Sequence, residues 1–302
     1  MDYSFIVVDL TTNQIVMKKL RNPQSQILLV ITLISAFLFM GCQKDSLEQT
    51  TTPTAPENSS SAAAPVRDSA VVNYYNFDNG LGNWFEKSTY YPYSATLSDV
   101  VKKSGKSVRF ELRKGEDKRT ELAVDPKTTP SESWYGFSIY IPASFSYDVS
   151  PESLVQFHSL PDFSQGEDWR SPPVMLGVMK DRMILDIRTN ANKVNKQDDF
   201  TFERQDLGAV AKDVWVDYVI HAKWAYDNTG VLEIWQNKKL VYNRQQKANR
   251  YNDVAFPYIK LGIYKWDWAG VSKSTTTDRV VYFDEVRIGN KFAGFEGVKT
   301  SF

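Results

Sequence analysis

The feature that most constrains the fold of this chain is a period of two in its apolar residues. Residues 107–112 show it clearly, because Val108, Phe110 and Leu112 alternate with charged side chains. Further strand-like segments lie at residues 215–224, 231–235, 239–242 and 280–288. Alternating side chains point to opposite faces of a β-strand. No long apolar stripe with a helical period follows residue 70, so we expect an all-β domain.

The arrangement of these segments narrows the fold class further. Gly, Asn, Asp and Pro separate many short strands, and no helices alternate with them. This pattern favours a two-sheet sandwich or jelly roll over a parallel α/β sheet. The roughly 230 residues after residue 70 suit one such domain, which we place at residues 71–302. The curved inner sheet of a jelly roll forms a concave groove that can accommodate an extended polymer.

The first 42 residues have the pattern of an export signal. The basic segment Met17-Lys18-Lys19-Leu20-Arg21 precedes an apolar run over residues 27–40, which ends at Gly41-Cys42. The run is shorter than the ~20 apolar residues of a membrane-spanning helix. A secretory signal peptide has this pattern, and residues 1–16 do not belong to it, so we expect Met17 to be the true start.

Cys42 is the chain's single cysteine, and its position directly after Gly41 resembles a bacterial lipoprotein signal. The resemblance implies that Cys42 becomes the lipidated N-terminus; a free thiol in an ordinary export signal is the alternative. Residues 43–70 are rich in Ser, Thr, Ala and Pro and are predicted to form a flexible tether. Together they predict a domain anchored to the outer membrane, on its periplasmic or cell-surface face.

Composition excludes several classes of partner and cofactor. The 36 Lys and Arg residues balance 36 Asp and Glu residues, so no basic surplus favours nucleic acid. One Cys excludes an internal disulfide and a multi-cysteine metal centre, and two His residues exclude a three-histidine site. We expect a monomer without a catalytic metal or a required cofactor. Asp78 and Asp284 are candidates for a structural Ca²⁺ site, with turn capping as the alternative.

The candidate site comes from strand alternation in three segments. Residues 119–124, 154–158 and 258–264 each read as a strand with one polar face and one apolar face. The residues that share a polar face are Arg119 and Glu121, then Gln156 and His158, then Tyr258, Lys260, Gly262 and Tyr264. If the three strands are neighbours, one surface collects a set of groups that an ordinary solvated face does not require.

This set matches the requirements of proton removal next to a carboxylate. Such a reaction needs groups that neutralise the carboxylate, a base for the proton and an acid for the leaving oxygen. Arg119 and Gln156 can hydrogen-bond the carboxylate. His158 can act as a base or stabiliser, and Tyr264 can protonate a glycosidic oxygen or, beside cations, act as the base. The groups therefore predict β-elimination on a uronic-acid polysaccharide.

The segments also resemble a known family. Arg119-Thr-Glu-Leu122, Gln156-Phe-His158 and Tyr258-Ile-Lys-Leu-Gly-Ile-Tyr264 occur in the order of the signature blocks of jelly-roll polysaccharide lyases. Their surroundings, over residues 72–292, look most like the heparin lyase I and glucuronan lyase branch; they include Tyr75-Asn-Phe-Asp-Asn-Gly80, Ser171-Pro-Pro173, residues 215–224 and Tyr282-Phe-Asp-Glu-Val286. The resemblance implies a concanavalin-like β-jelly roll sandwich with a concave substrate groove.

The resemblance also implies residue roles. In such lyases the matching Arg and Gln hold the substrate carboxylate, and the His and Tyr perform acid–base chemistry. Arg119, Gln156, His158 and Tyr264 are thus the predicted catalytic residues. The predicted substrate-binding residues are Lys260, Arg188, Trp266 and Glu121, the last by orienting a neighbouring Arg.

The substrate and two competing functions stay open. Alginate lyases of this fold usually continue past the Tyr with Asn-Gln, whereas Lys265-Trp266 follows here. Near-neutral charge argues against heavily sulfated heparin, so a glucuronan-type polymer is favoured, with heparin-like polymers or alginate as alternatives. A concanavalin-like glycoside hydrolase would need two close carboxylates, and no Glu-x-Asp-x-x-Glu run occurs. A non-catalytic glycan-binding lipoprotein would need only aromatic side chains, which make up 14% of the chain.

Overall fold

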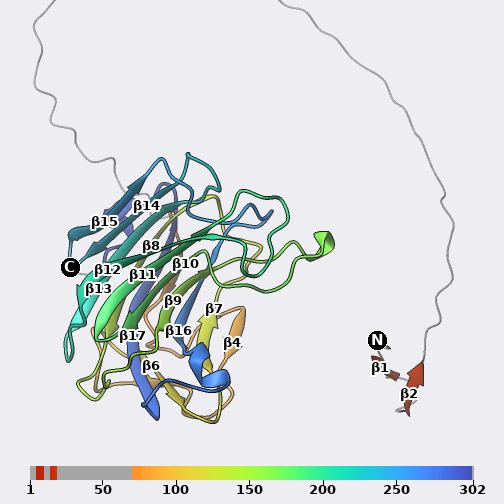
Figure 1. Cartoon of the computed structure of the whole chain (residues 1–302). Helices are drawn as coiled ribbons and strands as arrows, with labels where there is room; N and C mark the ends of the chain where they lie inside the picture. Colours follow the sequence, from red (N-terminus) through yellow and green to blue (C-terminus); the bar gives the residue numbers. More distant parts are fainter. Residues whose placement is uncertain (1–4, 10–13, 19–69, 301–302) are drawn as a thin grey trace, which may run out of the picture. The chain divides into compact units, whose positions relative to one another are not determined.

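The computed structural model describes residues 5–9, 14–18 and 70–300 (Figure 1). The chain forms two compact units, residues 1–61 and 62–302. In the first unit, β1 (Phe5–Asp9) and β2 (Gln14–Lys18) pair as an antiparallel hairpin. Cys42, the apolar run 27–40 and the tether up to residue 69 lie outside the described residues, so the export signal, the lipid anchor and the start at Met17 stay predictions. Among the described residues, no helix is long and apolar enough to cross a membrane.

The second unit contains a seven-stranded sheet that carries the candidate site. Figure 1 shows its strands side by side in the order β12-β11-β10-β9-β16-β7-β4. They are β4 (Glu86–Ser88), β7 (Arg119–Ala123), β9 (Glu152–His158), β10 (Val174–Met179), β11 (Arg182–Thr189), β12 (Thr201–Ala209) and β16 (Tyr258–Tyr264).

An eight-stranded sheet packs against it. Its order is β15-β14-β13-β8-β17-β6-β5, with β3 also paired to β17. The strands are β3 (Val71–Tyr75), β5 (Ala95–Ser98), β6 (Ser107–Arg113), β8 (Glu132–Tyr140), β13 (Trp215–Lys223), β14 (Val231–Gln236), β15 (Lys239–Gln245) and β17 (Asp278–Asn290). Three short helices complete the described part of this unit: η2 (Phe163–Gln165), η3 (Trp266–Ala269) and α1 (Gly294–Val298).

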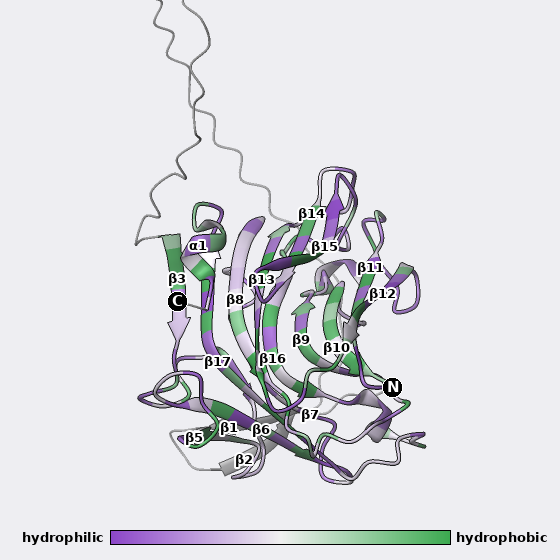
Figure 2. Ribbon diagram, turned by 90° about the vertical axis from the view of Figure 1, so that its left-hand side faces the viewer, coloured by the Kyte–Doolittle hydropathy of each residue, from purple (hydrophilic) through white to green (hydrophobic). Residues whose placement is uncertain are grey.

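All strand ladders in both sheets are antiparallel, and the core lies between the sheets. The predicted alternation explains which side chains enter it: Val108, Phe110 and Leu112 of β6 are buried there. Figure 2 shows the resulting hydrophobic and hydrophilic bands along the strands. Full burial of each such side chain contributes about 1.5–3 kcal/mol. The prediction of an all-β jelly-roll sandwich is confirmed.

The β14–β15 hairpin illustrates how turn residues set the register. Asn237 and Lys238 both have positive φ angles, of 49° and 69°, between the paired residues Gln236 and Lys239. Two consecutive left-handed residues define a type I′ turn, whose twist matches that of the flanking strands. The turn thereby fixes the register in which Gln236 pairs with Lys239.

Candidate active site

A cleft of about 700 Å³ lies on the seven-stranded sheet. Its lining comes from β4, β7, β16, β9, β10 and β11, so the cleft crosses the strands. The predicted site residues in this lining are Arg119, Gln156, His158, Arg188, Lys260, Tyr264 and Trp266. The structure therefore brings together, on one surface, residues that are up to 147 positions apart in the chain (Arg119 to Trp266, 266 − 119).

The three predicted strands are immediate neighbours in the order β9-β16-β7. Tyr264 is the cross-strand partner of Arg119, and Lys260 is the partner of Gln156. Cross-strand partners place their side chains on the same face of a sheet. The polar faces predicted separately for the three segments therefore form one continuous surface.

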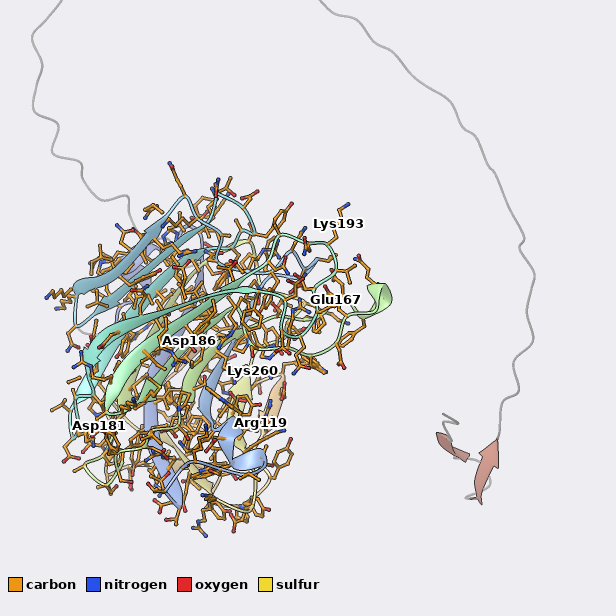
Figure 3. All side chains as sticks on the ribbon, viewed as in Figure 1. Arg119, Glu167, Asp181, Asp186, Lys193 and Lys260 are labelled. Carbon is orange, nitrogen blue, oxygen red and sulfur yellow. The ribbon has the colours of Figure 1, made fainter. Side chains whose placement is uncertain are left out.

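One row of such partners crosses the whole sheet with one residue on each strand. From β4 to β12 the row consists of Glu86, Ala123, Lys260, Gln156, Met175, Asp186 and Arg204. Figure 3 labels Asp186, Lys260 and Arg119, which come from different strands of this sheet. Because neighbouring strands lie about 4.8 Å apart, successive residues of this row are about 4.8 Å apart across the cleft.

A β-bulge determines the position of Tyr264. Leu261 pairs with Val155 and Tyr264 pairs with Ser153, so three steps along β16 match two steps along β9. Gly262 lies inside the bulge with a φ of +137°, and a Cβ atom there would lie 2.1 Å from the carbonyl oxygen of Thr120. Only glycine fits this close backbone approach.

The bulges also explain a site residue that alternation alone does not predict. A second register shift, between β9 and β10, leaves Leu154 unmatched, because Val155 pairs with Leu176 and Ser153 with Gly177. Ser153 consequently lines the cleft, although strict alternation from Gln156 would direct it to the core. Within the described residues, its buried hydroxyl has no hydrogen-bond partner.

Glu121 lies behind the cleft surface and holds two of its residues. Its buried carboxylate accepts a hydrogen bond from Nε2 of Gln156, and Nη1 of Arg119 lies 3.6 Å from its Oε2. Burial raises the pKa of Glu121 above its usual value, against the opposing effect of Arg119 and Lys260. The structure thus places Glu121 where it can orient Gln156 and Arg119, and away from direct contact with a ligand in the cleft.

Arg119 and Gln156 form a corner suited to an anion. The guanidinium of Arg119 lies 4.3 Å from the ring centre of Tyr264. One N–H of Gln156 Nε2 is donated to Glu121 and Oε1 is an acceptor, so the second N–H of Nε2 is the group of this amide that can donate to an anion. A carboxylate at this corner would meet a cation and an amide whose orientation Glu121 already fixes.

His158 is held in one tautomer. Its Nδ1 lies 2.7 Å from the carbonyl oxygen of Ser159. Because a carbonyl only accepts, Nδ1 carries the proton and Nε2 keeps its lone pair. Burial lowers the pKa of His158 to about 3, and the nearby cations Lys260 and Arg119 act in the same direction. The imidazole is therefore neutral at ordinary pH and can accept a proton or a hydrogen bond.

Lys260 is braced by a residue that the sequence did not single out. Its Nζ lies 3.1 Å from Oε2 of Glu86, which lies on the edge strand β4 and lines the cleft. The side chain of Lys260 is buried and that of Glu86 is half-exposed. The pair positions an ammonium beside Gln156 without leaving a buried charge uncompensated.

The far wall of the cleft contains Trp169 and Arg170, which the sequence also did not single out, although they adjoin the quoted Ser171-Pro-Pro173 block. The buried guanidinium of Arg170 pairs with Glu167 at 3.1 Å and with Asp253. The ring of Trp169 is half-exposed and meets His158 edge-on, with ring centres 5.6 Å apart. Arg170 thus fixes a wall whose aromatic residue faces the reacting region.

At the opposite end, Trp266 stands beside Tyr264, with ring centres 5.7 Å apart. Lys265, where alginate lyases have Asn, does not point into the cleft. It is fully buried and pairs with Asp148 at 3.1 Å and Glu152 at 3.4 Å. The departure from the Asn-Gln pattern therefore changes the cleft lining through Trp266.

The candidate calcium ligands act as caps in this structure. Asp284 accepts hydrogen bonds from the backbone N–H groups of Lys103 and Ser104, and Asp78 accepts one from Lys106. Both therefore hold the same loop, which agrees with the capping alternative; calcium at these residues stays a prediction. Elsewhere in the described residues, the carboxylates of Asp162, Glu167 and Asp253 lie close enough together to share a cation. The guanidinium of Arg170 already pairs with two of them, Glu167 and Asp253.

The other histidine lies on the other sheet. His221 of β13 contacts Glu233 at 2.8 Å and Glu132 at 3.1 Å, and its ring stacks on Trp134. These contacts give His221 a hydrogen-bonding and packing role. His158 is therefore the histidine that faces the cleft.

The seven-stranded sheet of this β-sandwich carries a cleft lined by paired cations, a tyrosine and a neutral histidine. This combination is typical of a polysaccharide-processing protein. Residues 81–287 match the family described as Polysaccharide lyase, which spans more than half of the chain. The chain belongs to this family, and it is a carbon–oxygen lyase acting on polysaccharides. No curated protein matches it.

The chain is similar to several solved structures. The endo-beta-1,4-glucuronan lyase from the fungus Trichoderma reesei is 21% identical, with a TM-score of 0.63 over 76% of this chain and 98% of that chain. The cellulose-induced protein Cip1 is 12% identical, with a TM-score of 0.47 over 72% and 96%. The alginate lyase AlyC3 is 15% identical, with a TM-score of 0.42 over 60% and 74%. At 21% identity, the similarity to the glucuronan lyase describes the fold alone.

Proposed function

We propose that this protein cleaves a uronic-acid-containing polysaccharide by β-elimination and that its substrate is of the glucuronan type. The observation that carries the proposal is the convergence of Arg119, Gln156, His158 and Tyr264 in one cleft. These residues supply the carboxylate-neutralising, basic and acidic groups that elimination requires. The architecture shared with a glucuronan lyase agrees with this substrate class.

In the proposed reaction, Arg119 and Gln156 hold the carboxylate of the reacting uronate. Removal of H5 places its electron pair on the carbon next to this carboxylate, and the guanidinium and amide stabilise the resulting anion. The electron pair then forms the C4–C5 double bond while the bond from C4 to the glycosidic oxygen breaks. A proton from Tyr264 completes the leaving hydroxyl, so both proton and electron counts balance.

The base depends on the stereochemistry of the sugar. In glucuronate, H5 and O4 lie on the same face of the ring, so the phenol oxygen of Tyr264 can take H5 and return a proton to O4. The guanidinium of Arg119 lies 4.3 Å from the ring centre of Tyr264, so a cation stands beside the reacting tyrosine. Where H5 and O4 lie on opposite faces, the free Nε2 of neutral His158 takes the proton instead.

The test is turnover on a panel of glucuronan, alginate and heparin-like polymers, followed by the ultraviolet absorbance of the unsaturated uronate product. We expect cleavage of glucuronan and its loss in Tyr264→Phe, whereas His158→Ala should abolish cleavage only of a polymer whose H5 and O4 lie on opposite faces. Matched controls are Tyr282→Phe and His221→Ala, which alter the same residue types outside the cleft. Full turnover by Tyr264→Phe on every cleaved polymer would contradict the proposed role.

The same assay separates the two competing functions. A hydrolase releases reducing ends without this absorbance, and a binding module gives neither signal. Hydrolysis through two carboxylates has little support, since Glu86 is the one carboxylate in the lining formed by the described residues. An unsaturated product would decide for elimination.

The proposal also includes attachment to the outer membrane through a lipid on Cys42. The support is the order of basic segment, apolar run and Gly41-Cys42 in the sequence. Labelled palmitate should be incorporated into the wild-type protein and not into Cys42→Ser, which should leave the membrane fraction. Equal membrane association of both proteins would contradict the anchor.

A further inference from the structure

A second cationic cluster lies on β11 and β12, away from the reacting groups. Arg188 donates from Nη2 to Asp186 at 3.2 Å, and Arg204 donates to the same carboxylate from Nε at 2.6 Å and Nη2 at 2.8 Å. Asp186 is fully buried. Phe202, which is half-exposed, lies within 4.9 Å of the Arg188 guanidinium and 5.4 Å of the Arg204 guanidinium, measured from its ring centre. The four side chains form one built unit.

The charge of this unit is unbalanced. Two guanidinium groups share one carboxylate, which leaves one net positive charge. Nε of Arg188 is buried and has no hydrogen-bond partner among the described residues, while its Nη1 donates to the carbonyl oxygen of Pro172 on the cleft wall at 3.2 Å. Arg188 itself lines the cleft. An anion arriving along the cleft would complete both the charge and the hydrogen bonding.

The distance from the reacting groups is set by the sheet. The row of partners passes from Gln156 on β9 through Met175 on β10 to Asp186 on β11, and Arg204 follows on β12. At about 4.8 Å for each strand, β11 lies roughly 10 Å from β9. An extended sugar unit is about as long as one strand spacing, so a polymer that crosses the strands advances by about one unit at each. In the same row of partners, strand β10 lies between β9 and β11 and carries the uncharged Met175.

We propose that Arg188 and Arg204, oriented by Asp186 and Phe202, form a subsite for the carboxylate of a second uronate, two to three units away from the uronate that reacts. This rests on the proposed elimination of a uronate polymer. The subsite therefore recognises the carboxylate of one further unit and requires a substrate long enough to reach β11.

The first experiment compares oligosaccharides of the cleaved polymer, one too short to reach β11 and one that extends past β12. In Arg188→Ala we expect kcat/KM on the long substrate to fall roughly ten- to hundredfold, mainly through KM, and to fall much less on the short substrate. The control is Arg182→Ala, which removes an arginine of β11 paired with exposed Asp206 outside the cleft. Equal losses on short and long substrates, or no loss on the long one, would overturn the subsite.

The second experiment does not depend on turnover. Calorimetry measures binding of an oligoglucuronate and of its carboxyl-reduced, neutral counterpart of the same length. We expect the wild-type protein to prefer the acidic oligosaccharide and Arg188→Ala to lose most of that preference, while equal preference in both proteins overturns the subsite. If no polymer is cleaved, the elimination fails, and this measurement still decides the subsite. Thermal unfolding of each variant shows whether it is folded.

Discussion

The substitution Gly262→Ala tests whether the bulge in β16 positions the active tyrosine. Gly262 has a φ of +137°, and an added Cβ atom would lie 2.1 Å from the carbonyl oxygen of Thr120 on β7. A residue other than glycine in this backbone region costs about 1–3 kcal/mol. The clash is with backbone, so β16 must move relative to β7, at a further cost of about 1–3 kcal/mol.

We therefore expect Gly262→Ala to lose roughly 2–6 kcal/mol of unfolding free energy. For a domain of this size each kcal/mol corresponds to a fall of about 2–4 °C in Tm. Since β16 carries Tyr264 opposite Arg119, a displacement of about 1 Å should also reduce kcat about a hundredfold. Thermal unfolding by circular dichroism and turnover on the cleaved polymer measure the two effects.

The matched control is Gly208→Ala. Gly208 also has a positive φ, of +111°, but a Cβ atom there meets nothing within 4 Å. Gly208→Ala should thus show the backbone cost alone and retain turnover, and the difference between the two variants isolates the clash. If Gly262→Ala melted together with Gly208→Ala and kept full turnover, the reasoning about the bulge would be refuted.

Three other predictions concern buried titratable side chains. Burial lowers the pKa of His158 from 6.5 to about 3, so the imidazole binds a proton at higher pH in the unfolded chain than in the folded protein. The free energy of unfolding therefore falls as the pH drops from about 6.5 to about 3, by on the order of 4 kcal/mol. Unfolding measured at several pH values should show a shallower fall in His158→Gln, and equal slopes would count against the buried neutral imidazole. Glu121→Leu removes the acceptor that orients Gln156 and should lower kcat/KM at least about tenfold. Glu121→Gln keeps an acceptor, so its kcat/KM should fall less. Identical kinetics of the two variants would argue against this orienting role. Lys265→Met removes a cation from two buried carboxylates and should lower the free energy of unfolding in urea by about 3 kcal/mol. The control Lys212→Met, at a more exposed ion pair, should lower it by less than about 1 kcal/mol. A similar loss in both variants would exclude the buried network.

Much of the fold could be predicted because the strands of this chain obey a strict pattern. The segment predicted at 258–264 is β16 itself, and Ile259, Leu261 and Ile263 are buried in the core as their spacing requires. The same alternation brought the polar faces of three strands together, since those strands are neighbours in the sheet. Periodicity determines which face a side chain occupies once two strands pair.

The remaining site residues depend on features that alternation does not encode. Ser153 reaches the cleft because Leu154 is unmatched in the ladder; Gly177 of β10 stands at this bulge, but the alternation within β9 does not reveal it. Glu86 joins the site through the pairing of β4 with β7, a contact between short segments in which Glu86 and its partner Ala123 are 37 positions apart (123 − 86). Arg170 comes from a loop, whose path follows from ion pairs with Glu167 and Asp253 rather than from a periodic pattern.

The charges in the cleft bear on the proposed substrate more directly than the net charge of the chain does. Four of the five cations in the described lining have an acidic partner within 4 Å; the pairs are Arg119–Glu121, Arg170–Glu167, Arg188–Asp186 and Lys260–Glu86, and Asp186 is shared with Arg204. A heavily sulfated chain carries several anionic groups on each repeating unit and would need many cations whose charge is not already balanced. A polymer with one carboxylate on each unit needs one cationic contact at a time, and paired, oriented guanidinium groups provide that with little reorganisation. The pairing of the cleft's cations thus supports a weakly charged polyuronate of the glucuronan type over a heparin-like substrate.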